Sequence, residues 1–257
     1  MLKLNGLPVP TTMFPDNTSQ VWKLPVEILN ETNYAHITWE FSNEGEFMQL
    51  AQLKMLLDAH GIAAGLKLKY LPYGRQDKSV SNDATFALRT FARQLNSLNF
   101  LEVLIADPHS EIAVRLIERS TAVYPIGQMH EAKRAVEADI LCYPDHGAVN
   151  KYSKIYVSQD YLEGSKTRDQ ATGQITHYSV IGNPAGKKVL IVDDICDGGA
   201  TFQLLAKELL NQGAKSVALF VTHGIFSKGT RCLFDAGISR VFTADGEVGP
   251  RTATKQV

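Results

Sequence analysis

The amino-acid sequence predicts an α/β protein with two domains, each a mostly parallel sheet flanked by helices. Apolar runs of strand length alternate with segments of helical periodicity along the chain. This alternation starts again near Ala138, and 257 residues suffice for one large domain or two small ones. Strands that alternate with helices favour parallel pairing, because each helix carries the chain back to the same end of the sheet.

In the first half, Phe47, Leu50 and Leu53 recur at helical spacing, and Gly61 is placed to end that helix. Two further segments share helical periodicity, and two short apolar runs are typical of buried strands. The predicted helices cover residues 46–60, 84–98 and 110–119, and the predicted strands cover residues 66–73 and 100–106.

In the second half, the continuous apolar run at residues 188–192 predicts a buried strand, and residues 201–211 predict an amphipathic helix. Further strands are expected at residues 139–143, 155–158, 217–221 and 241–243. The polar stretch from Gly164 to Thr176 predicts a flexible loop. We therefore expect one domain at residues 1–125 and a second at residues 126–257.

The charge balance argues against nucleic acid or a membrane surface as a partner. Lys and Arg number 26 and Asp and Glu 27, so the net charge is −1. No apolar run has the length of a membrane span, and the first ten residues lack the pattern of a signal peptide. Three cysteines (Cys142, Cys196 and Cys232) form no metal-binding cluster. These features predict a cytoplasmic protein that does not associate with a membrane.

Polar side chains follow several predicted strands at the point where each strand ends. His109 lies two residues beyond Asp107, Asp145 follows Tyr143-Pro144, and an Asp193-Asp194 pair follows the strand at 188–192. Ligands of open α/β sheets bind at the carboxyl ends of the strands. We therefore expect the ligand-binding and catalytic residues at the carboxyl ends of these strands.

The segment after residue 192 has the composition of a sugar-phosphate loop. Adjacent carboxylates accept hydrogen bonds from neighbouring ribose hydroxyls, while small residues at the start of a helix expose backbone N–H groups to a phosphate. Thr201 is suited to cap the following helix and to donate to a phosphate oxygen. The expected ribose 5-phosphate contacts are Asp193, Asp194, Asp197, Gly198, Gly199, Ala200 and Thr201.

This loop resembles the signature shared by phosphoribosyltransferases and ribose-phosphate pyrophosphokinases (PRPP synthetases), roughly V-[LI]-V-D-D-x-x-D-T-G-G-T. Gly198 stands where that pattern usually has Thr, and Ala200 where it has Gly. The resemblance implies two phosphoribosyltransferase-like domains, with ribose 5-phosphate bound by the second.

Further motifs resemble the pyrophosphokinases alone. Pro72–Lys78 is similar to P-Y-A-R-Q-D-[KR], which implies ATP contacts from Arg75, Gln76 and Asp77. Residues 107–110 resemble D-L-H-A, and residues 143–148 resemble S-P-D-x-G-G. In the family, these two motifs place Mg²⁺-ATP, so His109 and Asp145 are the implied metal contacts, and His109 also belongs to the ATP site.

Three more resemblances complete the set. Lys166 and Arg168 match the K-x-R spacing of the catalytic loop, and Thr222–Ser227 matches T-H-G-I-F-S. Phe14 and Asp16 resemble F-[PS]-D-G-E, which in the family reaches the adenine of a neighbouring subunit, so a homo-oligomer (dimer or hexamer) is implied.

The resemblance implies transfer of the β,γ-pyrophosphoryl group of ATP to C1 of ribose 5-phosphate, giving PRPP and AMP, with Mg²⁺ as cofactor. Two alternatives remain open: a phosphoribosyltransferase that consumes PRPP, and a non-catalytic regulatory relative. The resemblance runs from about Phe14 to about Thr243, shorter at both ends than the family. We therefore do not expect family-style control by phosphate or ADP.

Overall fold

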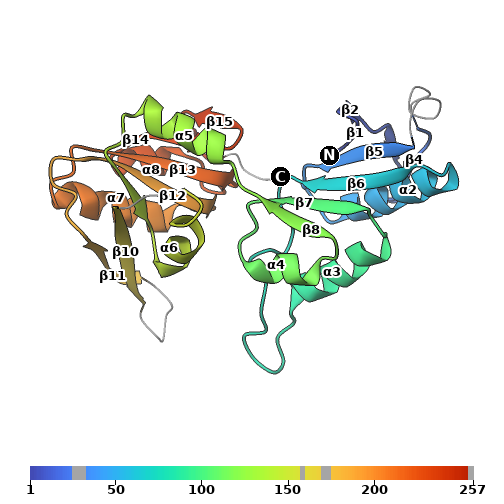
Figure 1. Ribbon diagram of the computed structural model, residues 1–257, viewed down its shortest axis with the longest axis horizontal. Helices are drawn as coiled ribbons and strands as arrows, with labels where there is room; N and C mark the ends of the chain where they lie inside the picture. The colour runs from blue at the N-terminus through green and yellow to red at the C-terminus, as the bar shows by residue number, and fades with distance from the viewer. Residues whose placement is uncertain (25–32, 157–159, 169–174, 254–257) are drawn as a thin grey trace. The chain divides into compact units, whose positions relative to one another are not determined.

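The computed structural model describes residues 1–24, 33–156, 160–168 and 175–253. The chain forms two compact units, Met1–Val123 and Tyr124–Val257 (Figure 1). Each is a mixed α/β unit with a mostly parallel sheet, as the sequence predicts.

Unit 1 contains a six-stranded sheet in the order β2-β1-β5-β6-β7-β8. Its four strands β5 to β8 pair in parallel, while β1 and β2 form an antiparallel edge. A separate hairpin, β3-β4, precedes the parallel strands. The strands are β1 (Leu2–Leu4), β2 (Leu7–Pro8), β3 (Thr11–Met13), β4 (Ser19–Val21), β5 (Tyr34–Trp39), β6 (Ala63–Leu68), β7 (Glu102–Ala106) and β8 (Ser120–Val123).

Three helices connect the parallel strands of unit 1: α2 (Gly45–Ala59), α3 (Ala87–Ser97) and α4 (Glu111–Leu116). Apolar residues of α2 and α3, among them Leu50, Leu53 and Leu88, are fully buried together with Trp39 of β5. The three helices predicted from periodicity in this half are therefore confirmed, with ends shifted by a few residues.

Unit 2 contains a seven-stranded sheet in the order β11-β10-β9-β12-β13-β14-β15. Its five central strands are parallel, and β11 and β15 are antiparallel edges. The strands are β9 (Ile140–Tyr143), β10 (Tyr161–Arg168), β11 (Ile175–Ile181), β12 (Lys188–Cys196), β13 (Ser216–Gly224), β14 (Ile238–Thr243) and β15 (Gly246–Val248).

The helices of unit 2 are α5 (Ile126–Ala135), α6 (His146–Tyr152), α7 (Ala200–Asn211) and α8 (Arg231–Asp235). Residues 189–192 of β12 are all buried, which is the continuous apolar pattern of a strand covered on both faces. Alternate residues contribute to two separate clusters, with Ile191 in one and Leu190 in the other.

Two predictions about local structure are wrong. Ile155 and Tyr156 lie in a turn after α6 instead of a strand. Residues 164–168 and 175–176 of the expected loop are strand instead, since β10 continues to Arg168 and β11 begins at Ile175, while residues 169–174 lie outside the described residues. Polarity alone misled the prediction, because β11 is an edge strand and residues 164–168 of β10 pair only with it, so few apolar side chains are needed.

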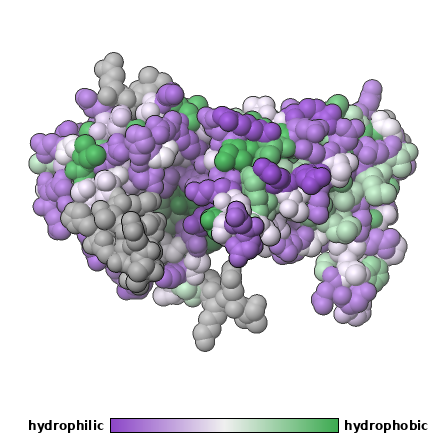
Figure 2. Space-filling view, turned by 90° about the horizontal axis from the view of Figure 1, so that it is seen from below, coloured by the Kyte–Doolittle hydropathy of each residue, from purple (hydrophilic) through white to green (hydrophobic). Residues whose placement is uncertain are grey.

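Apolar side chains are mostly inside both units, and Figure 2 shows a mainly hydrophilic face with only small hydrophobic patches. Within the described part of the chain, no helix combines the length and the apolar character needed to cross a membrane.

Candidate functional site

The strand β12 positions the two acids that the sequence analysis singled out. Asp193 and Asp194 lie within β12, which extends to Cys196, so they do not follow the strand as expected. Beyond Ile191, the last residue of β12 that pairs with β9, the strand is paired only with β13. The two side chains nevertheless lie close together, since a side-chain hydrogen bond with Asp194 and the charge of Asp194 both raise the pKa of Asp193.

These two carboxylates have different electrostatic surroundings. Burial, reinforced by the charges of Asp194 and Asp145, raises the pKa of Asp193 well above its usual range. The Asp193 Oδ1 atom accepts a hydrogen bond of 2.9 Å from the backbone N–H of Asp194. Asp194 is only 5% exposed, and its Oδ2 atom lies 3.6 Å from the Nζ atom of Lys151 on α6. The Lys151 ammonium therefore balances the charge of Asp194, while burial and the neighbouring acids disfavour ionisation of Asp193.

Lys151 is a residue that the sequence analysis missed. Its ammonium lies 4.8 Å from the ring centre of Tyr152, on the same helix, in addition to its ion pair with Asp194. A single Lys on a short helix carries no motif, and only the packing of α6 beside β12 reveals the contact.

The loop after β12 has the backbone geometry expected of a phosphate cradle. Gly199 has a φ of 77°, which favours glycine, and it is the N-cap of α7. Thr201 is therefore the second residue of the helix and not its cap, which corrects the prediction. No side chain caps α7 and no acidic residue lies in its first turn, so its N–H groups and helix dipole are available to an anion.

Asp145 follows β9 and is the N-cap of α6. Its Oδ1 atom accepts a hydrogen bond of 3.1 Å from the backbone N–H of Ala148. Ala148, which replaces the second glycine of the family motif, is buried. Asp145 also lies close enough to Asp193 to contribute to its raised pKa, so both acids belong to one edge of the sheet of unit 2.

In unit 1, the predicted ATP segment forms the turn between β6 and α3. Tyr73 has a φ of 61°, and the backbone N–H of Gln76 donates to the carbonyl of Tyr73 at 2.9 Å. The carbonyl of Gln76 then accepts from the N–H of Leu88, which ties the turn to α3. The side chains of Arg75 and Gln76 are exposed and Asp77 is half-buried.

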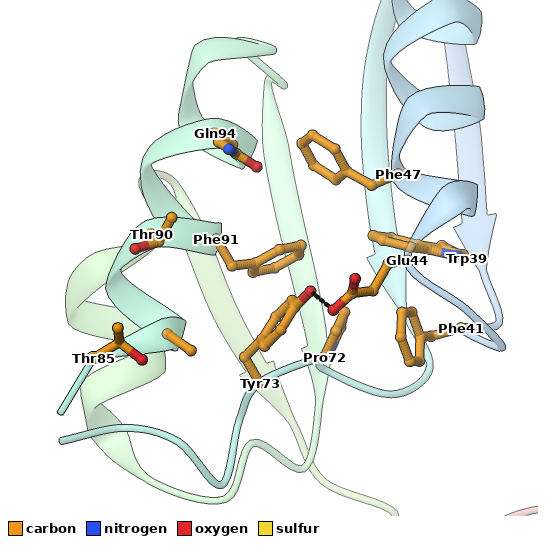
Figure 3. A pocket seen from close by; sticks show the side chains of 11 residues that line it. Trp39, Phe41, Glu44, Phe47, Pro72, Tyr73, Thr85, Thr90, Phe91 and Gln94 are labelled. Carbon is orange, nitrogen blue, oxygen red and sulfur yellow. Dashed lines mark hydrogen bonds between the residues drawn. The ribbon is translucent and has the colours of Figure 1, made fainter. Parts of the chain in front are cut away.

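A cavity of about 440 Å³ adjoins this turn (Figure 3). Its walls are largely aromatic, and its one charged lining residue is Glu44, whose Oε1 atom accepts a 2.6 Å hydrogen bond from Tyr73. That hydrogen bond, together with burial, raises the pKa of Tyr73 to about 12. The rings come from Trp39, Phe41, Phe47, Tyr73 and Phe91. The sequence predicts only a helical position for Phe47, and no pattern in it indicates this cavity.

His109 lies beyond the carboxyl end of β7, where the sequence placed it. The preceding Asp107 is 1% exposed with a φ of 40°, and its N–H donates to the carbonyl of Val123. This turn leaves His109 exposed, one residue before the N-cap of α4.

Phe14 and Asp16 lie in the turn of the β3-β4 hairpin. Asp16 Oδ1 accepts hydrogen bonds from the hydroxyl of Thr18 (2.7 Å) and from its backbone N–H (3.0 Å), and these bonds lower the pKa of Asp16. The ring of Phe14 lies 6.4 Å from that of Trp22 and is 37% exposed. The hairpin thus presents both residues at its surface.

Lys166 and Arg168 belong to β10, and Lys166 pairs with Tyr178 of β11. The register shifts between Thr167 and Arg168, at the end of the described hairpin. The side chains of both residues lie outside the described part of the structure, as do residues 169–174 of the predicted loop.

Within unit 2, the structure thus brings together Asp145, Asp193, Asp194 and the loop at 197–201. In unit 1 it places the turn at 72–77 beside the aromatic cavity. Among the described residues, no group of three or more His, Cys, Asp or Glu side chains could hold a metal ion.

Comparison with known proteins connects these features to one family. Residues 151–248 match the model of the phosphoribosyl transferase domain. A ribose-phosphate pyrophosphokinase of Saccharolobus solfataricus is 24% identical over 237 residues, which cover 90% of this chain and 81% of the relative. One of Cereibacter sphaeroides is 30% identical over 169 residues, which cover 62% of this chain and 50% of the relative.

The fold has a counterpart among solved structures. Phosphoribosylpyrophosphate synthetase from Mycobacterium smegmatis superimposes with a TM-score of 0.74 at 19% identity, covering 91% of this chain and 78% of that one. At this identity the likeness establishes the fold alone. The chain is therefore similar in sequence to ribose-phosphate pyrophosphokinases along most of its length, and it has the phosphoribosyltransferase-like α/β fold.

Proposed function

We propose that this protein is an enzyme that transfers the β,γ-pyrophosphoryl group of ATP to the C1 hydroxyl of ribose 5-phosphate, giving PRPP and AMP. The observation that carries the proposal is the acid pair of β12 followed by the uncapped start of α7, in a chain whose relatives are named ribose-phosphate pyrophosphokinases. A hydroxyl-binding carboxylate next to an anion-binding helix start matches a ribose phosphate.

The acceptor would be held entirely by unit 2. Asp193 and Asp194 would bind the ribose hydroxyls, and residues Asp197 to Thr201 would surround the 5-phosphate. Lys151 would balance the charge of Asp194 and hold its carboxylate in position, through their 3.6 Å contact.

ATP would be bound through the turn of unit 1. The Arg75 guanidinium is suited to a bidentate phosphate contact, with Gln76 and Asp77 adding hydrogen bonds. Phe14 and Asp16 would contact the adenine of ATP bound to a neighbouring subunit, which makes a homo-oligomer part of the proposal.

The Asp145 carboxylate fits Mg²⁺, which prefers oxygen ligands and commonly uses one or two protein carboxylates together with substrate phosphates. Asp145 of unit 2 would contact the ion bound with ATP, and the resemblance implies a further contact from His109 of unit 1. Bound there, Mg²⁺ would neutralise charge on the phosphates. The side chain of Asp145 is already oriented by its hydrogen bond with Ala148.

Lys166 and Arg168 would contact the pyrophosphoryl group during transfer. Phosphoryl transfer relies on alignment and on stabilisation of charge, so two cations on one strand suit this role. We place the reaction in the cytoplasm, in nucleotide biosynthesis.

One assay separates this proposal from its two alternatives. The purified protein is incubated with ATP, Mg²⁺ and ribose 5-phosphate, and AMP and PRPP are quantified. We expect both products in equal amounts. Pyrophosphate released from PRPP and a base, without AMP formation, would instead identify a phosphoribosyltransferase, and no turnover in either assay would identify a regulatory relative.

The Lys166→Ala variant tests the role of β10. We expect turnover to fall by about 10²- to 10³-fold, since one transition-state contact is removed. Binding of ribose 5-phosphate, measured by calorimetry, should be nearly unchanged. Lys207→Ala, which removes an exposed cation from α7, is the matched control. Unchanged turnover of Lys166→Ala would refute the assignment.

A further inference from the structure

A lysine from another loop lies over the position where the phosphate loop lacks a side chain. Gly198 stands where the related signature has Thr, so one hydroxyl donor is missing. A Cβ atom at residue 198 would lie 3.5 Å from Cδ and 3.6 Å from Cε of Lys228, which is ordinary van der Waals contact. The stem of Lys228 therefore lies against the phosphate loop, beside the place of the missing side chain.

The backbone around Lys228 fixes this position. The N–H groups of Ile225 and Phe226 both donate to the carbonyl of Cys196, at 2.9 and 3.1 Å, which attaches the loop after β13 to the end of β12. Gly229 has a φ of 71° and packs against the backbone of residues 251–253 so closely that no Cβ fits. Lys228 is thus held between two anchored points, directly across from Gly198.

The charge of Lys228 is not used within the described part of the protein. Its side chain is exposed and makes no hydrogen bond or ion pair with any described residue. Asp197 lies in the loop, Asp193 and Asp194 precede it in β12, and Lys151 is paired with Asp194. A phosphate placed in this loop would be repelled by those acids unless a further cation faced it.

We propose that Lys228 is the cation that binds the phosphate monoester of the acceptor, in place of the hydroxyl absent at residue 198. The inference rests on the proposed function, because it assigns a residue to the acceptor site of that reaction. An ammonium is a mobile point charge with three donors, so it replaces a fixed hydroxyl without requiring one geometry.

Calorimetric titration of Lys228→Met with ribose 5-phosphate tests this assignment. Met keeps most of the apolar stem and removes the charge. We expect the affinity for ribose 5-phosphate to fall about 10- to 100-fold, as for loss of a hydrogen bond to a charged group. The affinity for ribose without phosphate should stay the same. Lys207→Met, which removes an exposed cation from α7, should bind both ligands as the parent does.

A second variant tests the link with residue 198. Gly198→Thr restores the hydroxyl, and the backbone accepts it because Gly198 is not in the left-handed region and its nearest neighbours are the flexible atoms of Lys228. In this background Lys228→Met should cost less affinity than in the parent. An equal cost in both backgrounds would show that the two groups do not share one phosphate.

The outcomes also separate this inference from the proposed function. If Lys228→Met binds ribose 5-phosphate as tightly as the parent, or loses ribose and ribose 5-phosphate equally, the role of Lys228 is refuted. If the parent binds inorganic phosphate but not ribose 5-phosphate, and Lys228→Met loses that binding, Lys228 is a phosphate ligand and the proposed acceptor is wrong. If the parent binds neither, both are wrong.

Discussion

The two units contain the same local arrangement but differ in whether a carboxylate lies at the start of its helix. In unit 1, β5 leads through a short loop into α2 and on to the parallel strand β6. In unit 2, β12 leads through a short loop into α7 and on to β13. Both helices therefore start at the carboxyl end of a central strand, where the backbone N–H groups attract negative charge.

Unit 1 supplies that negative charge itself. The carboxylate of Glu46, in the first turn of α2, accepts hydrogen bonds from the indole of Trp39 (2.9 Å) and from the backbone and hydroxyl of Ser42 (2.9 and 2.7 Å). Burial raises the pKa of Glu46, but these bonds and that from the terminal amine outweigh it and lower the pKa. Glu44 precedes the helix and binds Tyr73 in the aromatic cavity.

Unit 2 has no such carboxylate at the corresponding position. Its helix starts at Gly199 without a side-chain cap and without an acid in the first turn. The difference teaches that a helix start meets the protein's own carboxylate in one unit and not in the other, and under the proposed function the start of α7 accepts the phosphate of the substrate.

The largest expected effect comes from removing the internal carboxylate of unit 1. Glu46→Gln should lower the free energy of unfolding of unit 1 by about 2–3 kcal/mol, because buried hydrogen bonds to a charged group are lost. Chemical denaturation at neutral pH measures this. The folded-state pKa is lowered, so the loss should be full above the unfolded pKa and should vanish as pH falls through the folded one. Weaker ribose 5-phosphate binding in this variant would contradict the division of roles between the units.

A smaller effect is expected from the glycine pair of unit 2. Gly199→Ala should cost about 1–2 kcal/mol, because the residue has a positive φ and its Cβ would lie 2.9 Å from Leu233. It should also weaken ribose 5-phosphate binding by displacing the start of α7. Gly198→Ala is the matched control, since its Cβ meets only flexible atoms of Lys228. Equal stability of the two variants in thermal unfolding would show that backbone conformation does not shape this loop.

The smallest expected effect has the opposite sign. Asp193→Asn should raise the stability of unit 2 by up to about 1 kcal/mol at neutral pH, because an ionised carboxylate is disfavoured there. The folded-state pKa is raised, so the parent should lose stability as pH rises from the usual carboxyl range through that raised value. The gain should therefore disappear at acid pH. A destabilised Asn variant at neutral pH would mean that Asp193 is held as an ion.

The sequence alone determined the fold class and indicated the residues of the candidate site. Two patterns were enough for the fold class: continuous apolar runs such as residues 188–192, and helical spacing such as Phe47, Leu50 and Leu53. Each reflects which side chains of one segment are buried, so it can be recognised without knowing which segments pack against it. Gly199 could also be recognised from the sequence, because few residues other than glycine adopt a positive φ.

Only the tertiary structure decided which groups face one another. The β10-β11 hairpin was misread as a loop because its stability depends on pairing with a distant segment, not on its own polarity. Lys151 beside Asp194, Lys228 over Gly198 and the rings around Glu44 come from separate stretches of chain. Their proximity depends on how helices and loops pack on a sheet. The sequence of one segment does not show which charged or small residues will lie opposite it.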